Sequence, residues 1–160
     1  MATAIPDLDR TTERQLAAGL FNDTWRLLEL PDRTPEQIDE LIHCAHASRY
    51  HWGRVGEPAN LARGEWLCAR VYAVLGRAEP ALWHARRCLS IVEATPAGEG
   101  GLEDWDLANA YESLARASAV AGDHEAARRW IALGHDALAL VTDVEDREIV
   151  GKDLDSIPME

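Results

Sequence analysis

The chain has 160 residues, 47% of them hydrophobic, and its 28 acidic and 16 basic residues give a net charge of -12 at pH 7. This length fits one domain with its own core. The acidic balance argues against a nucleic-acid partner, because binding nucleic acid brings lysine and arginine to phosphates. No apolar run approaches the roughly 18 residues of a membrane span, and the N-terminus lacks the pattern of a signal peptide. We therefore expect a cytoplasmic protein with no membrane partner.

Helix start and stop signals predict seven helices in chain order. The first opens at Thr12, where Gln15 completes a capping box, and ends near Leu30. The second opens at the stronger capping box of Thr34 and Gln37 and ends within 53–56. The others are expected over about 57–76, 79–94, 103–121 and 123–141, and from Thr142 onward. No segment alternates with period two, so strands are not expected.

Apolar residues recur at helical spacing within these segments, as Leu107, Tyr111 and Leu114 do in the fifth. Short connections make consecutive helices antiparallel neighbours. The sequence thus predicts an all-α array of about three αα-hairpins with a C-terminal capping helix, in one domain over residues 1–160. The three cysteines, Cys44, Cys68 and Cys88, are odd in number and form no C-x-x-C motif, so we expect buried free thiols.

An internal repeat appears when Gly76 is aligned with Gly122. In both copies a helix of small and apolar residues reaches the glycine, a turn follows, and an alanine stands five residues later (Ala81 and Ala127). The offset of 46 residues leaves room for an inserted loop at TPAGEGG, residues 95–101. This loop is expected to be the least ordered part of the chain.

The two copies resemble the tetratricopeptide repeat (TPR). The second copy supplies the pattern residues Tyr111, Leu114, Ala115, Gly122 and Ala127, whereas the first departs from it at Glu65, Cys68 and Ala85. The resemblance covers residues 60–141, and residues 1–55 do not register to the pattern. It implies a right-handed superhelix in which the first helix of each hairpin lines a groove. The matching groove positions are Arg63, Trp66, Arg70, Asn109, Glu112 and Arg116.

The charge distribution fits a groove of that kind. Residues 41–92 carry seven arginines against three acidic residues, although both flanking segments are strongly acidic. In some TPR proteins such a groove clamps a terminal carboxylate, and the planar guanidinium suits this chemistry because it donates two parallel bonds. The alternative is that Glu112 and Arg116 pair with each other, four residues apart, while Arg63 and Arg70 face solvent.

A second set of polar side chains follows one line of the second helix. Asp39, His43, His46 and Tyr50 are spaced by four, three and four residues, which places them on one face. Asp39, His43 and His46 could hold a divalent metal, or Asp39 could orient His43 in a proton relay. The other interpretations are polar packing between helices, and binding of a partner or organic ligand by His43, His46 and Tyr50.

The sequence contains no phosphate-binding glycine loop, no G-x-S-x-G and no H-E-x-x-H motif. We therefore expect a non-catalytic module without a cofactor that binds a protein or an acidic peptide through the basic, aromatic groove. A metalloprotein or small-molecule enzyme built on the histidine line is the alternative. Two repeats are few for a solenoid, so we expect that the first hairpin and the last helix act as caps, or that a homodimer buries the remaining apolar surface.

Overall fold

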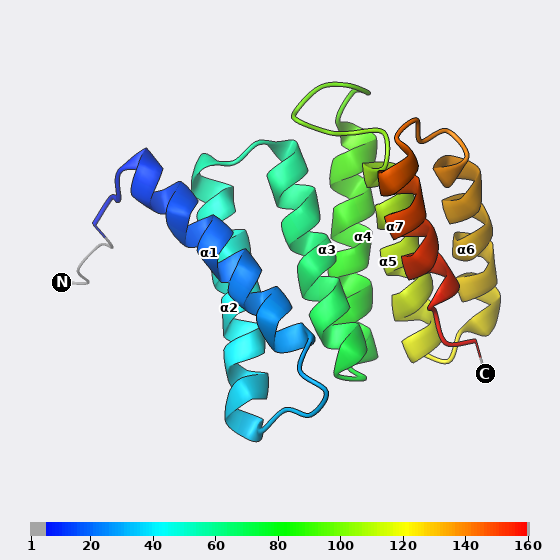
Figure 1. Cartoon of the computed structure of the whole chain (residues 1–160), viewed down its shortest axis with the longest axis horizontal. Coiled ribbons are helices and arrows are strands. Elements are labelled where there is room, and N and C mark those ends of the chain that lie inside the picture. The colour runs from blue at the N-terminus through cyan, green and yellow to red at the C-terminus, as the bar shows by residue number, and fades with distance from the viewer. Residues whose placement is uncertain (1–5, 160) are drawn as a thin grey trace.

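The computed structural model describes residues 6–159, and all regular secondary structure within that range is helical, as predicted. Figure 1 shows the helices in an elongated array with the first and the last helix at opposite sides. The helices are α1 (Arg10–Leu28), α2 (Pro35–Val55), α3 (Pro58–Val74), α4 (Ala78–Ala94), α5 (Asp106–Val120), α6 (His124–Leu138) and α7 (Val144–Asp155).

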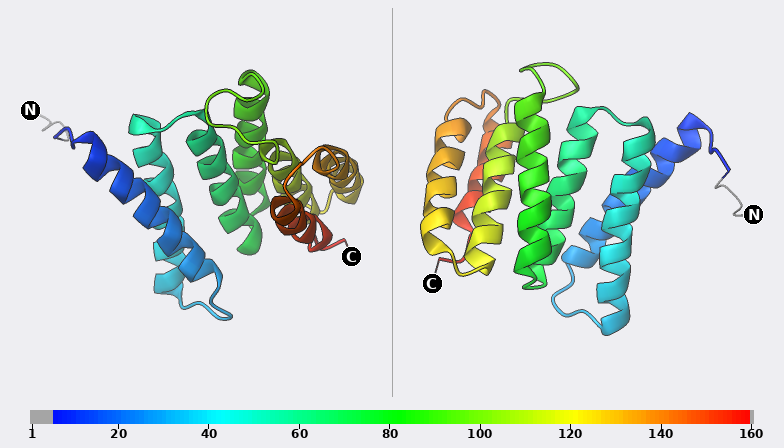
Figure 2. Two further views of the ribbon diagram at one scale, coloured as in Figure 1. Left: turned by 45° about the horizontal axis from the view of Figure 1, so that its top comes forward. Right: turned by 180° about the vertical axis from the view of Figure 1, so that it is seen from behind.

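The array consists of helix hairpins, which confirms the predicted fold class. The closest packing joins α1 to α2, α3 to α4 and α5 to α6, and α3 also lies against α5. Figure 1 shows α1 in front of α2 and α7 in front of α5, and the view from behind shows the reverse order for both pairs (Figure 2). No helix of the described residues is both long and apolar enough to cross a membrane.

The N-terminal ends of α1 and α2 are capped by side chains. The prediction for α2 is confirmed, because Thr34 accepts from the Gln37 backbone N–H at 3.3 Å and Gln37 accepts from that of Thr34 at 2.9 Å. The prediction that Thr12 caps the first helix is wrong. Asp9 is the cap residue, and Thr12 instead donates its backbone N–H to the Asp9 carboxylate at 3.0 Å.

The aligned glycines make the same turn in both hairpins. Gly76 has φ of 69° and Gly122 has φ of 77°, a region where a Cβ would be strained. The N–H of Arg77 donates to the Tyr72 carbonyl at 2.8 Å, and that of Asp123 donates to the Ser118 carbonyl at 3.0 Å. In each case an N–H donates to the carbonyl five residues earlier, which is the hydrogen bond of the Schellman motif that ends a helix at a glycine. The alignment is therefore correct at these two turns.

The loop after α4 packs on the start of α3. The Gly100 carbonyl accepts the Ala59 N–H at 2.9 Å, and a Cβ on Gly100 would lie 2.8 Å from Pro58. The Gly101 carbonyl accepts from Arg63 at 3.4 Å. These contacts fix the last two residues of the loop on α3.

Helix α7 closes the C-terminal end of the array. Leu154 lies against Gly134 of α6, where an added Cβ would come within 2.7 Å of the leucine, so the glycine permits the close approach. The predicted start of this helix at Thr142 is displaced, because Asp143 is the cap. Thr142 donates its N–H and its hydroxyl to Asp104 at 2.9 Å each, which ties the chain before α7 to the chain before α5.

Candidate functional site

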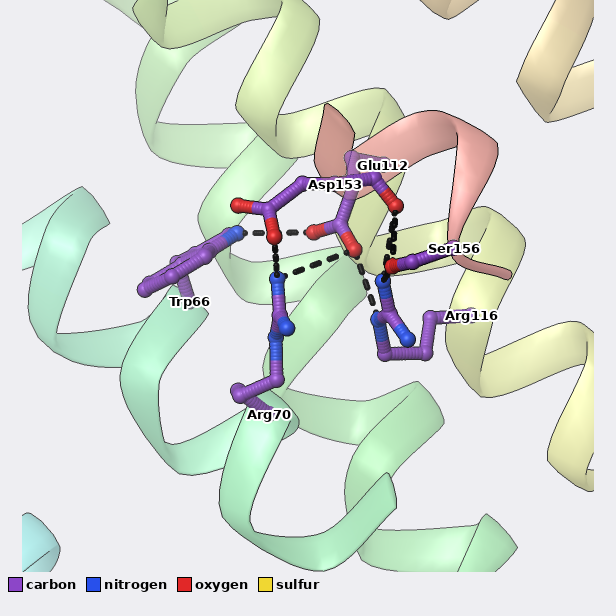
Figure 3. Close-up of polar contacts among 6 residues, drawn as sticks. All are labelled: Trp66, Arg70, Glu112, Arg116, Asp153 and Ser156. Carbon is purple, nitrogen blue, oxygen red and sulfur yellow. Dashed lines mark hydrogen bonds and ion pairs between the residues drawn. The ribbon is translucent and has the colours of Figure 1, made fainter. Parts of the chain in front are cut away.

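The predicted groove residues of α3 and α5 come together around one carboxylate. Glu112 is completely buried. One of its oxygens accepts from Trp66 Nε1 at 3.0 Å, and the other accepts from Arg70 Nη2 at 3.2 Å and from Arg116 Nε at 2.6 Å. Figure 3 shows these side chains converging on Glu112 from two neighbouring helices. Arg70 also lies over the Trp66 ring, 5.0 Å from its centroid.

The end of α7 completes this cluster. Asp153 Oδ1 lies 3.2 Å from Arg70 Nη2, and the Asp153 carbonyl accepts from Arg116 Nη2 at 2.8 Å. The hydroxyl of Ser156 accepts from Arg116 at the same distance (Figure 3). Arg70 and Arg116 are each only 12% exposed. Both guanidinium groups are therefore bound by groups of this chain.

The third arginine is paired in the same way. Arg63 donates to both carboxylate oxygens of Asp106, from Nε at 3.0 Å and from Nη2 at 2.8 Å. Its guanidinium carbon lies 4.4 Å from the centroid of the Trp105 ring. The expectation that Arg63 and Arg70 form a solvated face is thus wrong, whereas the pairing of Glu112 with Arg116 is correct. The fork geometry predicted for a ligand carboxylate is satisfied internally, by Asp106.

A hollow of about 140 Å³ opens beside these residues, between α1, α3 and α5. Its walls are aromatic, since Trp25 and Trp66 lie with ring centroids 5.7 Å apart and Phe21 and Trp105 stand beside them. Asn109 supplies a polar group, because its Oδ1 is shielded from solvent without a hydrogen-bond partner. The full lining is Phe21, Trp25, Ala62, Arg63, Trp66, Cys88, Trp105, Asp106 and Asn109.

A second hollow of about 190 Å³ shares Phe21 and Arg63 with the first. It is further lined by Ala18, Asn22, Trp52 and Asn60. The shared side chains make the two hollows neighbours along α1 and α3. We call them together the aromatic groove. Each is smaller than the roughly 300–1,000 Å³ of a typical small-molecule site, so each has room for a group about the size of one side chain.

The predicted histidine line is divided by the fold. Asp39, His43 and Tyr50 are exposed. Tyr50 packs against His51 of its own helix and lies under Arg54. Only His46 turns toward other helices, where Tyr72 OH lies 2.8 Å from its Nε2. The predicted metal set of Asp39, His43 and His46 is therefore not assembled, and Asp39 makes no hydrogen bond to His43 among the described residues.

His46 instead joins a cluster built from three helices. Its ring centroid lies 5.2 Å from that of His84 on α4, and Tyr72 of α3 stacks on His84 at 5.8 Å. Burial lowers the pKa of His46, and the neighbouring His84 adds to this effect, so the imidazole is neutral at pH 7. Cys68, on α3, is fully buried, and desolvation raises the pKa of its thiol to about 12.

Glu65 anchors the same cluster from within α3. It accepts from Arg49 Nε of α2 at 2.9 Å, and its other oxygen lies 2.6 Å from His84 Nδ1. Burial by itself would raise the pKa of Glu65, but the His84 hydrogen bond and the Arg49 charge outweigh it and hold the pKa below its ordinary value. This carboxylate is therefore ionised and fixes the His84 ring.

Sequence reasoning missed Phe21 and Trp25, because residues 1–55 could not be registered to the repeat. It also missed the cluster of Cys68, His84 and Glu65. One signal was present: Glu65, Cys68 and Tyr72 are spaced by three and four residues, which places them on one face of a helix. Their partners on α2 and α4 could not be assigned without the packing of those helices.

No protein-family model matches this chain, and no curated protein matches it.

Proposed function

We propose that this protein is a non-catalytic, TPR-like module that binds a peptide segment of a partner protein in the aromatic groove. The observation that carries the proposal is Asn109 Oδ1, an acceptor without a partner beside an aromatic hollow. A buried acceptor that lacks a hydrogen bond costs free energy, and a rotation of the Asn109 amide toward the hollow would let a peptide N–H satisfy it. Trp25, Trp66 and Trp105 would then hold an apolar side chain of that peptide.

The size and lining of the aromatic groove support a peptide with bulky apolar residues. Two hollows that share Phe21 and Arg63 can each take one side chain. Aromatic residues are enriched at the centre of protein interfaces because they bury large areas at low entropic cost. The proposed partner differs from the acidic peptide expected from the sequence, since Arg63, Arg70 and Arg116 already have carboxylate partners.

Selection from a random peptide library tests this proposal. Wild-type protein should enrich peptides that share a large apolar residue. Trp105→Ala and Asn109→Ala should weaken their binding at least tenfold. Trp83→Ala is the matched control, because Trp83 is 61% exposed on α4, outside the groove, and should bind as the wild type does. Equal binding by the wild type, Trp105→Ala and Asn109→Ala would contradict the proposal.

The salt dependence of the selected complex gives a second test. Because Arg63, the arginine that lines the aromatic groove, is paired with Asp106, the dissociation constant should change little between low and high salt, as exposed charges are the ones that salt screens. A steep loss of affinity with salt, removed by Arg63→Gln, would favour the acidic peptide instead. We also propose a cytoplasmic location, which the three unpaired cysteines support.

A further inference from the structure

We propose that His46, Cys68 and His84 form a binding site for a single Zn²⁺ ion. One ligand atom from each of these three side chains lies within 4.8 Å of the other two. Tetrahedral zinc with two nitrogens and a sulfur holds them about 3.3–3.6 Å apart. Rotations that move each donor by about 1 Å would therefore close the site. The site uses residues outside the aromatic groove, so it does not depend on the proposed function.

The donor set selects the class of metal. Two imidazoles and a thiolate are the ligands that zinc takes in proteins, whereas Mg²⁺ and Ca²⁺ require oxygen ligands. Three protein ligands leave a fourth position. The hydroxyl of Tyr72, 2.8 Å from His46 Nε2, or a water molecule can take it. On binding, the Cys68 S–H bond breaks, a Zn–S bond forms, and the proton leaves to solvent.

Glu65 prepares His84 as a ligand. A carboxylate only accepts hydrogen bonds, so His84 Nδ1, 2.6 Å from Glu65, is the nitrogen that carries the donated proton when the ring acts as a metal ligand. The lone pair is then on Nε2. A carboxylate that orients a ligating histidine through its second nitrogen is the usual support of a zinc site. Arg49 holds Glu65 in turn, at 2.9 Å. The support therefore exists without the ion.

The position of the cluster indicates what the ion would do. His46 belongs to α2, Cys68 to α3 and His84 to α4, so one ion would link the first hairpin to the second. In the described residues these hairpins meet chiefly through α2 and α3. His46 and His84 are partly exposed, which gives the ion an entry path. A structural zinc that stabilises the folded chain is the expected role.

Titration with Co²⁺ as a spectroscopic substitute for Zn²⁺ tests the site. In a Cys44→Ala/Cys88→Ala double variant, Cys68 is the sole thiol. We expect one Co²⁺ per chain, a cobalt–thiolate charge-transfer band in the near ultraviolet, and displacement by Zn²⁺. Adding Cys68→Ser should abolish the band, and adding His84→Gln should weaken binding at least tenfold. His43→Ala is the control on α2, because His43 is exposed, and should leave the titration unchanged.

Thermal unfolding of the wild-type chain gives a readout that needs no variant. Zn²⁺ should raise the midpoint temperature in proportion to the logarithm of its concentration, and Mg²⁺ should not. Absence of both the charge-transfer band and the Zn²⁺ shift would overturn the proposal, even where Cys68→Ser fails to fold. Zinc binding of unchanged affinity in folded Cys68→Ser and His84→Gln would also overturn it.

Discussion

Glu112 is the most enclosed charged residue of the candidate site. Its carboxylate is fully buried and accepts from Trp66, Arg70 and Arg116. Burying a carboxylate is costly unless several donors replace its water, and here three side chains do so. Removal of the carboxylate would leave two largely buried guanidinium groups without their main partner. Glu112 therefore matters mainly because it supplies a hydrogen-bond partner to three largely buried side chains, and less because of the Coulomb attraction of any one ion pair.

Glu112→Ala should lower the free energy of unfolding by about 3–5 kcal/mol, the usual cost of breaking a buried ion pair from one side. Chemical denaturation measures it. Glu125→Ala is the matched control, since Glu125 also pairs with an arginine four residues on, Arg129, but both side chains are more than 60% exposed. It should cost less than about 0.5 kcal/mol. Equal losses in the two variants would contradict the role assigned to Glu112.

The turns within the second and third hairpins depend on glycine at one position. Gly76 and Gly122 both adopt positive φ, and no heavy atom would meet an added Cβ at either. The cost of a side chain there is thus backbone strain alone. Gly19, inside α1, also has open space around it but keeps helical geometry. The same substitution should therefore have opposite effects in the two settings.

Gly122→Ala should destabilise the protein by about 1–2 kcal/mol, the penalty for a left-handed residue with a Cβ. Gly19→Ala should stabilise it by about 0.4–1 kcal/mol, because alanine restricts the unfolded chain more than glycine does. Both changes can be measured as shifts of the urea midpoint of unfolding, provided that the slope of the unfolding free energy against urea concentration stays constant. A stabilised Gly122→Ala variant would mean that this turn does not require the positive φ.

Buried carboxylates recur along the whole array. Glu13 of α1, Glu65 of α3 and Glu112 of α5 are each less than 10% exposed. Glu13 lies 2.8 Å from His51 and 2.9 Å from Arg54 of α2. Each acid is thus held by basic side chains of a neighbouring helix. Four of the seven arginines within residues 41–92 pair with acids of α1, α3, α5 and α7: Arg49, Arg54, Arg63 and Arg70.

A core substitution should destabilise mainly the helices around it, because in the described residues each helix packs mainly on its neighbours in the array. Leu154→Ala removes a side chain that is 2% exposed in α7 and should cost about 2–5 kcal/mol. Hydrogen exchange should show lost protection in α5–α7, with α1 and α2 unchanged. Leu27→Ala, at the other end and 1% exposed, should show the reverse. Uniform loss along the chain would mean that the array unfolds as one unit.

The sequence determined those features that depend on local chemistry. Helical periodicity, the Thr34 capping box and the two aligned glycines each act within a few residues, so they predicted the helices, their connections and the hairpin order. Local signals were less reliable where two nearby polar residues could each cap the same helix. Asp9, not Thr12, caps α1, and Thr142 binds Asp104 instead of capping α7.

Tertiary structure alone decided what each functional side chain contacts. Helical phase placed Arg63 and Arg70 on one face of α3, and the repeat resemblance added Arg116 of α5. The carboxylates that meet them come from Asp106, Glu112 and Asp153, up to 83 residues away. The same phase placed His46 beside His43, whereas packing turned it to Cys68 and His84. Periodicity fixes the direction of a side chain around its own helix, and only the packing of a second helix supplies the partner.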